Sequence, residues 1–232
     1  MKIGIVTAMA EEMKPLYNKL GNTVAEKIVH GVRVSEIKLG ENTVYLATGG
    51  VGEINAAMTV QMLVDLFEVE AVLNFGFVGT LRADIKLSEL VIADRVCHYQ
   101  FDTSAIDGTK VGQYFENPDI YFYLDEALIT RVQAAISTPL RRVAVASGDV
   151  FVASEEQKKR LAEEFNCDIC EMELAALAMA CKRNEIPLLS IKVVSDGADS
   201  GAPLSFDEVV KKGMSKYEQI LPAVLSAVVE KR

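Results

Sequence analysis

Residues 170–199 read CEMELAALAMACKRNEIPLLSIKVVSDGAD, and this stretch predicts a helix followed by a buried strand. The small apolar residues at 174–181 are typical of a helix packed inside a fold, and the run at 188–194 is typical of a strand buried on both faces. Two acids interrupt the apolar pattern: Glu173 starts the helix and Asp196 closes the strand. A strand that ends on Ser-Asp-Gly presents a carboxylate at the carboxyl edge of its sheet, where open α/β folds bind ligands.

Each of these acids has a local explanation when it is taken alone. The helix dipole favours an acid such as Glu173 at the amino end of a helix, and Asp196 is a common type of turn residue. The two acids together, joined by one helix and one buried strand, favour a functional site.

Strand-like and helix-like segments alternate along the chain. Apolar runs predict buried strands at 2–8, 71–75, 89–94 and 142–146, and helical periods predict helices at 10–20, 53–67, 124–136, 155–165 and 205–231. The alternating residues 26–47 predict an antiparallel meander. This order predicts an α/β fold, with one domain over residues 1–232 and a mixed, mostly parallel central sheet flanked by helices.

Composition and charge restrict the class of protein. The chain has 232 residues, of which 50% are hydrophobic, and this is enough for a substantial core without disulfides. The formal net charge of −9 disfavours nucleic acid and anionic membranes as partners. No apolar run reaches the length of a membrane span, and residues 1–12 lack a signal-peptide pattern, so we expect a cytoplasmic protein.

The cysteines raise the question of a redox or metal role. Cys167 and Cys170 have the C-x-x-C spacing, which occurs in thioredoxin-like redox sites and in zinc sites. A redox pair would open a helix after a strand, and zinc would need two more ligands, but His30 and His98 are not paired in sequence with these cysteines. We therefore expect the cysteines to pack in the core, and we expect no metal or cofactor.

Small, glycine-rich segments follow four of the predicted strands: TGGVG at 48–52, GFVG at 76–79, SGDVF at 147–151 and SDGAD at 195–199. The carboxyl ends of parallel strands lie at one edge of a sheet, so these segments should meet there. The helix after the first strand adds one more acid to this edge. The sequence therefore predicts a cleft that gathers Glu12, Asp149, Glu173 and Asp196.

The residue types of this cleft favour one kind of chemistry. The chain has no GxSxG nucleophile motif, no GxGxxG dinucleotide motif and no P-loop. Carboxylates without a metal suit reactions at an acetal-like carbon, where one acid protonates the leaving group and another positions water and stabilises a cationic transition state. For a purine nucleoside the acid would act in the base pocket, and burial would help to keep it protonated.

Several segments resemble the bacterial 5′-methylthioadenosine/S-adenosylhomocysteine nucleosidases of the purine nucleoside phosphorylase superfamily. In chain order they are MKIGIVTAMAEEM, TGGVGEINAA, NFGFVG, SGDVF, EMELAALA, VVSDGAD and LSFDE. The resemblance covers almost the whole chain, and AMxEE together with EME and SD is specific to the nucleosidase branch. It implies a hydrolase of methionine salvage that cleaves methylthioadenosine and adenosylhomocysteine to adenine and the free ribose derivative, without a cofactor.

Carried over residue by residue, the resemblance implies three catalytic acids. Glu12 would hold and activate the attacking water, Asp196 would protonate N7 of adenine, and Glu173 would bind the ribose hydroxyls. Ser195 would orient the carboxyl of Asp196. The other substrate-binding residues would be Met172 and Phe77 beside the sugar, Phe151 and Val152 on the adenine, and Met9, Val51 and Phe206 around the 5′-alkylthio group.

The sequence departs from the family pattern at three places. Residues 76–79 read glycine-phenylalanine-valine-glycine instead of glycine-serine-alanine-glycine, so the ring of Phe77 replaces a small hydroxyl. Lys192 replaces an arginine, and residues 98–104 are only loosely similar to the segment that reaches a neighbouring subunit. These differences bear on the choice of substrate more than on the reaction.

Two alternatives remain open from the sequence. A phosphate-dependent phosphorylase of the same fold would need cations or hydroxyls around phosphate, but the turns at Gly50 and Gly76 contain no arginine and Glu12 would repel the anion. A nucleoside-binding protein with weak or no catalysis would not need matched acids. The resemblance also implies a homodimer, and the long loop predicted at 99–118 suits a partner contact.

Overall fold

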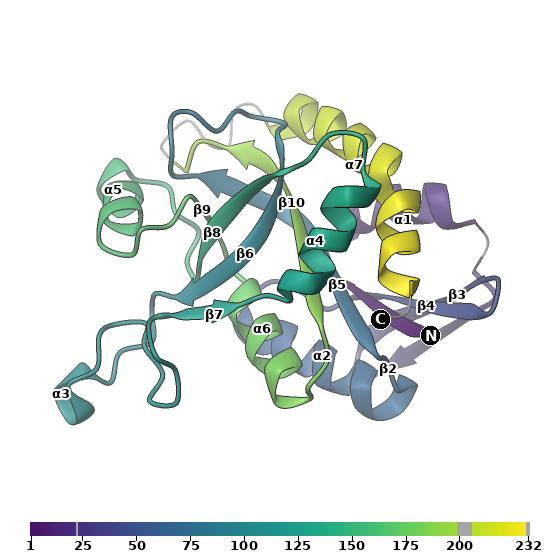
Figure 1. Ribbon diagram of the computed structural model, residues 1–232, viewed down its shortest axis with the longest axis horizontal. Helices are drawn as coiled ribbons and strands as arrows, with labels where there is room; N and C mark the ends of the chain where they lie inside the picture. The colour runs from purple at the N-terminus through teal and green to yellow at the C-terminus, as the bar shows by residue number, and fades with distance from the viewer. Residues whose placement is uncertain (22, 199–205, 231–232) are drawn as a thin grey trace.

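The computed structural model describes residues 1–21, 23–198 and 206–230, and its helices surround one mixed sheet (Figure 1). The helices are α1 Ala10–Leu20, α2 Glu53–Phe67, α3 Ser104–Asp107, α4 Glu126–Ala135, α5 Glu155–Glu163, α6 Leu174–Arg183 and α7 Phe206–Val229. The strands are β1 Lys2–Thr7, β2 Ala25–Val29, β3 Val32–Leu39, β4 Asn42–Thr48, β5 Ala71–Thr80, β6 Leu90–His98, β7 Tyr121–Tyr123, β8 Arg141–Ser147, β9 Ile169–Glu171 and β10 Leu188–Asp196. The predicted class, an α/β fold with a mixed sheet flanked by helices, is confirmed.

Part of the sheet closes on itself. Strand β5 pairs with both β10 and β9, β10 pairs with β6, and β8 pairs with both β6 and β9. These five strands form a closed circuit, from which β1, β4, β3 and β2 extend as an open arm that includes the predicted meander. The closure was not predicted, and it brings residues of β9 and β10 to the same end of β5.

Helices cover the sheet on two sides. Helices α2 and α6 pack together on one side, and α1, α4 and α7 lie together on the other (Figure 1). On the α7 side, Tyr217 stacks on Phe75 of β5 with ring centroids 3.7 Å apart, and both residues are buried. Burial of a phenylalanine side chain such as that of Phe75 stabilises a fold by roughly 1.5–3 kcal/mol. Within the described residues, no helix is both long and apolar enough to cross a membrane.

Strand β5 corrects one prediction. The sequence predicted a strand that ends at residue 75 and a turn at 76–79, whereas β5 continues to Thr80 and pairs with β10 as far as Gly79. A Cβ atom on Gly76 would lie 3.0 Å from Glu12 Oε1, and one on Gly79 would lie 2.8 Å from Asp196 Oδ1. The glycines therefore let two acids approach the strand closely, which is a common reason for glycine inside a strand.

The shortest elements were also missed. Strands β7 and β9 have three residues each, too few to show a periodic pattern. The long irregular segment predicted at 99–118 is present between β6 and β7, and the single-turn helix α3 within it projects from the body (Figure 1).

The cysteines pack in the core, as predicted. Cys97, Cys167, Cys170 and Cys181 are all free and buried. Burial raises the pKa of the Cys97 thiol to about 12, so this thiol stays protonated at neutral pH. Cys170 also lines the cavity described next.

Candidate active site

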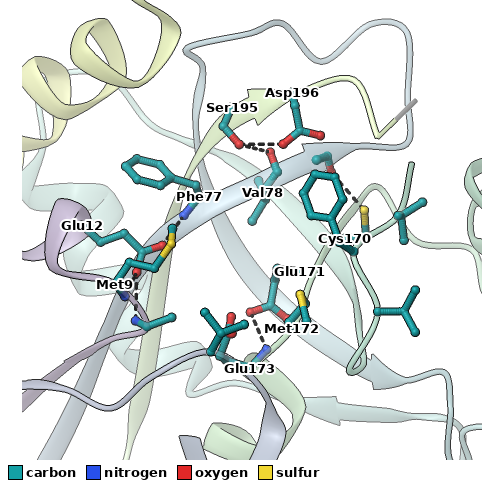
Figure 2. Close-up of a pocket in the computed structure, with 16 residues that line it drawn as sticks. Met9, Glu12, Phe77, Val78, Cys170, Glu171, Met172, Glu173, Ser195 and Asp196 are labelled. Carbon is teal, nitrogen blue, oxygen red and sulfur yellow. Dashed lines mark hydrogen bonds between the residues drawn. The ribbon is translucent and has the colours of Figure 1, made fainter. Parts of the chain in front are cut away.

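A cavity of about 280 Å³ lies where β1, β5, β9 and β10 end. The three predicted catalytic acids line it, as do most of the predicted substrate-binding residues: Met9, Val51, Phe77, Phe151, Val152, Met172 and Ser195. Figure 2 shows Glu12, Asp196 and Glu173 approaching the cavity from three different sides. The side chain of Phe206, the remaining predicted residue, lies outside the described part of the structure.

Glu12 of α1 is held at one wall by backbone N–H groups. Its Oε2 accepts hydrogen bonds from the N–H groups of Ala8 and Met9, both at 2.9 Å, and its Oε1 accepts one from Phe77 at 3.0 Å. Burial raises the pKa of Glu12, although the hydrogen bonds and the positive charge of Lys192 act in the opposite direction. A buried carboxylate with a fixed orientation and a raised pKa is suited to take a proton from water.

Asp196 lies on another wall, at the end of β10 (Figure 2). The hydroxyl of Ser195 lies 2.8 Å from Asp196 Oδ2, and the N–H of Ala198 donates to Oδ1 at 2.9 Å. The same hydroxyl lies 3.2 Å from the carbonyl oxygen of Val78, which links the acid to β5. The carboxyl is therefore held by its own turn while it faces the cavity.

Glu173 precedes α6, but it does not act as a simple helix cap. Its side chain makes no capping hydrogen bond, and its Oε1 instead accepts one from the N–H of Gly52 at 2.8 Å. Burial, together with the nearby charge of Glu171, raises the pKa of Glu173 to about 7, although Lys192 lowers it. The acid therefore changes charge near neutral pH, and it can bond hydroxyl groups in either state.

A buried ion pair beside the cavity was not predicted. Lys192 Nζ lies 3.0 Å from Glu171 Oε2, and both side chains are 2% exposed. Glu171 also accepts hydrogen bonds from the N–H groups of Glu173 and Leu174, so the pair fixes the start of α6. The one indication in the sequence was a lysine inside the apolar run 188–194, because a buried charge requires a partner.

Asp149 does not line the cavity, contrary to the prediction. Its Oδ1 accepts a hydrogen bond from the N–H of Glu53 at 2.8 Å, so the carboxylate stabilises the amino end of α2. The first N–H groups of α2 have no partners within the helix, so they are available to bond to this carboxylate.

Glu53 is a further buried acid, and nothing in the sequence indicated that it would be buried. Its Oε2 accepts a hydrogen bond from the N–H of Ala176, and its Oε1 lies close to the hydroxyl of Ser147, both at 2.6 Å. Burial raises the pKa of Glu53 to about 8, and the charge of Glu171 adds to the shift. Glu53 is therefore mostly protonated at neutral pH, and it joins α2, β8 and α6 behind the cavity.

The segment between β8 and α5 supplies an aromatic rim. Phe151 is 58% exposed, whereas its neighbour Val152 is buried in the same apolar cluster as Cys170. An exposed ring at the edge of a cavity can stack on a planar base. Across the cavity, the ring of Phe77 lies 6.2 Å from that of Phe75, on the side of β5 that α7 covers.

The residues of the cavity can supply proton transfer and hydrogen bonding. Among residues 1–21, 23–198 and 206–230, no three His, Cys, Asp or Glu side chains are arranged to hold a metal ion. The carboxylates bond to backbone N–H groups, to the Ser195 hydroxyl and to Lys192 instead.

Comparison with known proteins identifies the family of this chain. A family described as the phosphorylase superfamily matches residues 2–230. The 5′-methylthioadenosine/S-adenosylhomocysteine nucleosidase of Haemophilus ducreyi is 31% identical over 229 residues, which cover 97% of this chain and 98% of the relative.

Two solved structures are similar along their whole length. The futalosine hydrolase of Helicobacter pylori superposes with a TM-score of 0.91 at 28% identity, covering 97% of each chain. The nucleosidase of S. pneumoniae with the transition-state inhibitor MT-ImmA superposes with a TM-score of 0.89 at 33% identity, covering 98% of this chain and 100% of that chain. The chain therefore belongs to the phosphorylase superfamily, in the branch that holds the methylthioadenosine/adenosylhomocysteine nucleosidases and the futalosine hydrolases.

Proposed function

We propose that this protein hydrolyses the N-glycosidic bond of 5′-substituted adenine nucleosides, with methylthioadenosine and adenosylhomocysteine as substrates. The observation that carries the proposal is the position of Glu12 and Asp196 on different walls of one cavity (Figure 2). An acid and a base on opposite sides of a glycosidic bond are what hydrolysis at an acetal-like carbon requires.

In the proposed reaction, adenine stacks on Phe151 and its N7 faces Asp196. The protonated carboxyl of Asp196 gives its proton to N7, and the bond between C1′ and N9 breaks with its electron pair going to the base. A water molecule held by Glu12 adds to the cationic C1′ and gives a proton to the carboxylate of Glu12. Each of these proton transfers contributes roughly a hundred- to ten-thousand-fold to the rate.

The charges around the cavity favour the cationic sugar of the transition state. Glu12, Glu171 and Glu173 lie near one another, and Lys192 balances part of their negative charge. Groups that are fixed before the reaction stabilise a developing charge without having to reorganise. Glu173 would also hold the ribose hydroxyls, with Met172 packed against the sugar.

We expect the protein to release adenine from methylthioadenosine in phosphate-free buffer, and added phosphate should not change the rate. The N–H groups of Ala8, Met9 and Phe77 could bind an anion, but they already bond to Glu12, whose carboxylate would repel phosphate. The measurement is adenine release with and without phosphate, over a panel that includes adenosylhomocysteine, 5′-deoxyadenosine and a futalosine-type nucleoside.

Each alternative gives a different result in this assay. Strict dependence on phosphate would show a phosphorylase. Stable binding of methylthioadenosine in calorimetry, without release of adenine, would show a nucleoside-binding protein. The panel also ranks the nucleosides by their 5′ groups. This ranking is needed because Phe77, which would lie beside the sugar, differs from the family pattern and bears on the choice of substrate.

We also propose that the protein is a homodimer that pairs through α2. A groove of about 460 Å³ is lined by α2 and α6 together with His98 and Tyr114. On α2, Ile54 is 73% exposed and Met58 is 61% exposed, and clusters of exposed apolar side chains often mark protein contacts. The N-cap of α2 is Gly52, which bonds to Glu173, so a partner bound here would lie next to the cavity.

The Met58→Glu variant should separate the proposed dimer, because it would bury an unpaired charge between the subunits. Sedimentation equilibrium should give twice the chain mass of 25.3 kDa for the wild type and a shift toward the single-chain mass for the variant. Leu87→Glu, at an exposed apolar residue that does not line the groove, is the matched control and should remain dimeric. A monomeric wild type would refute the proposal.

A further inference from the structure

We propose that Lys158 of α5 is a positioning residue for the general acid, because it holds the turn that orients the carboxyl of Asp196. This inference rests on the proposed function, in which Asp196 protonates the leaving base. It concerns a side chain outside the cavity, on a helix that otherwise carries no part of the reaction.

Lys158 differs from its neighbours in the basic run at 158–160. The sequence predicted this run to be a solvated face, and Lys159 and Arg160 are indeed exposed. Lys158 is half-buried, and its Nζ donates a hydrogen bond to the carbonyl oxygen of Gly197 at 2.6 Å. The contact joins residues 39 positions apart in the chain. A charged donor makes a stronger hydrogen bond than a neutral one, so this contact can fix a backbone carbonyl.

The carbonyl belongs to the turn that holds the acid. Ala198, the next residue, has a φ of 52°, in the left-handed region that non-glycine residues avoid. In this conformation its N–H donates to Asp196 Oδ1 at 2.9 Å. Such a conformation persists only where the surroundings hold it, and Lys158 bonds to the peptide group immediately before it.

The same helix follows the aromatic rim. Phe151 and Val152 line the cavity, and Ser154 then begins α5 by accepting a hydrogen bond from the N–H of Gln157 at 3.3 Å. One turn further on, Lys158 reaches the turn after β10. Lys158 therefore joins the segment that would stack on the base to the segment that would protonate it, and the two parts of the purine site are held together.

The test compares Lys158→Met with Lys158→Arg and with the exposed neighbour variant Lys159→Met, using methylthioadenosine as substrate. Lys158→Met should lower kcat by about ten- to a hundredfold, the effect expected for a lost hydrogen bond from a charged donor, with KM changed by less than about threefold. Lys158→Arg should regain most of the rate, Lys159→Met should match the wild type, and thermal unfolding should show that all variants are folded.

A double variant separates positioning from general destabilisation. If Lys158 acts through Asp196, adding Lys158→Met to Asp196→Asn should slow the residual single-turnover rate by less than about threefold. Losses that multiply, a rise in KM alone, or a Lys158→Met enzyme as fast as the wild type would each overturn the inference. A wild type that releases no base from any nucleoside of the panel would overturn the proposed function and this inference together.

Discussion

The Asp196→Asn variant should release adenine about a hundred to ten thousand times more slowly than the wild type, while it folds normally. Asparagine has the same shape as aspartate, and its Oδ1 can still accept the N–H of Ala198. Its amide group can donate to the hydroxyl of Ser195, which now lies 2.8 Å from the carboxyl. The variant therefore keeps the turn and loses only the transferable proton.

The leaving group provides the control for this prediction. A nitrophenyl riboside releases nitrophenolate, a stable anion that needs no proton in order to leave. Asp196→Asn should therefore slow the cleavage of this substrate far less than the cleavage of methylthioadenosine. Ser195→Ala should give a smaller loss with methylthioadenosine, because it removes a group that orients the acid and leaves the acid itself. Near-normal release of adenine by Asp196→Asn would show that Asp196 is not the acid.

The Glu12→Gln variant should lose a similar factor in kcat, about a hundred- to ten-thousand-fold, because an amide cannot take a proton from water. It should also lose some stability. The carboxylate accepts hydrogen bonds from Ala8, Met9 and Phe77, whereas an amide nitrogen cannot accept one. One backbone N–H is then left without a partner, which costs about 1–3 kcal/mol in the free energy of unfolding.

The dependence of kcat/KM on pH separates the two effects of this variant. Burial raises the pKa of Glu12, so the wild-type rate should fall with acid at a pH above the ordinary range of a glutamate, as the base becomes protonated. The residual rate of Glu12→Gln should lack that fall. Normal turnover by a folded Glu12→Gln enzyme would remove Glu12 from the mechanism.

The sequence was most informative where local pattern determines structure. Helix α1 was predicted with its observed bounds, because Met13, Leu16 and Tyr17 recur at helical spacing, and the start of α2 was predicted from the glycine-rich turn before it. The three acids that are proposed to be catalytic were predicted to share a cleft because each stands near the end of a predicted strand or helix, and the resemblance assigned them separate roles. All three line one cavity, as predicted, because the strands next to them end at the same edge of the sheet.

The sequence was least informative where long-range contacts determine the local structure or the partner of a side chain. Glycines at 76 and 79 look the same in a turn as in a strand, and only the acids packed against them distinguish the two. Asp149 stands at a strand end like Asp196, but a nearby helix end offers it an unpaired N–H group. The pairing of Lys192 with Glu171 joins β10 to β9 across 21 positions of the chain, so no local pattern could reveal it.

Strand β5 also sets the distance between the two points at which the proposed base and the proposed acid contact it. Glu12 abuts Gly76 and Asp196 abuts Gly79, three residues further along the same extended backbone. At about 3.3 Å per residue, these contact points are separated by about 10 Å, a length fixed by covalent geometry and independent of loop conformation. In the proposed reaction, the 5′ group of the nucleoside would lie outside this span, because Glu12 acts at C1′ and Asp196 acts at N7. We therefore expect relatives with differently named substrates to vary at the 5′ end of the site while one rigid strand keeps the contact points of the two acids at a constant separation.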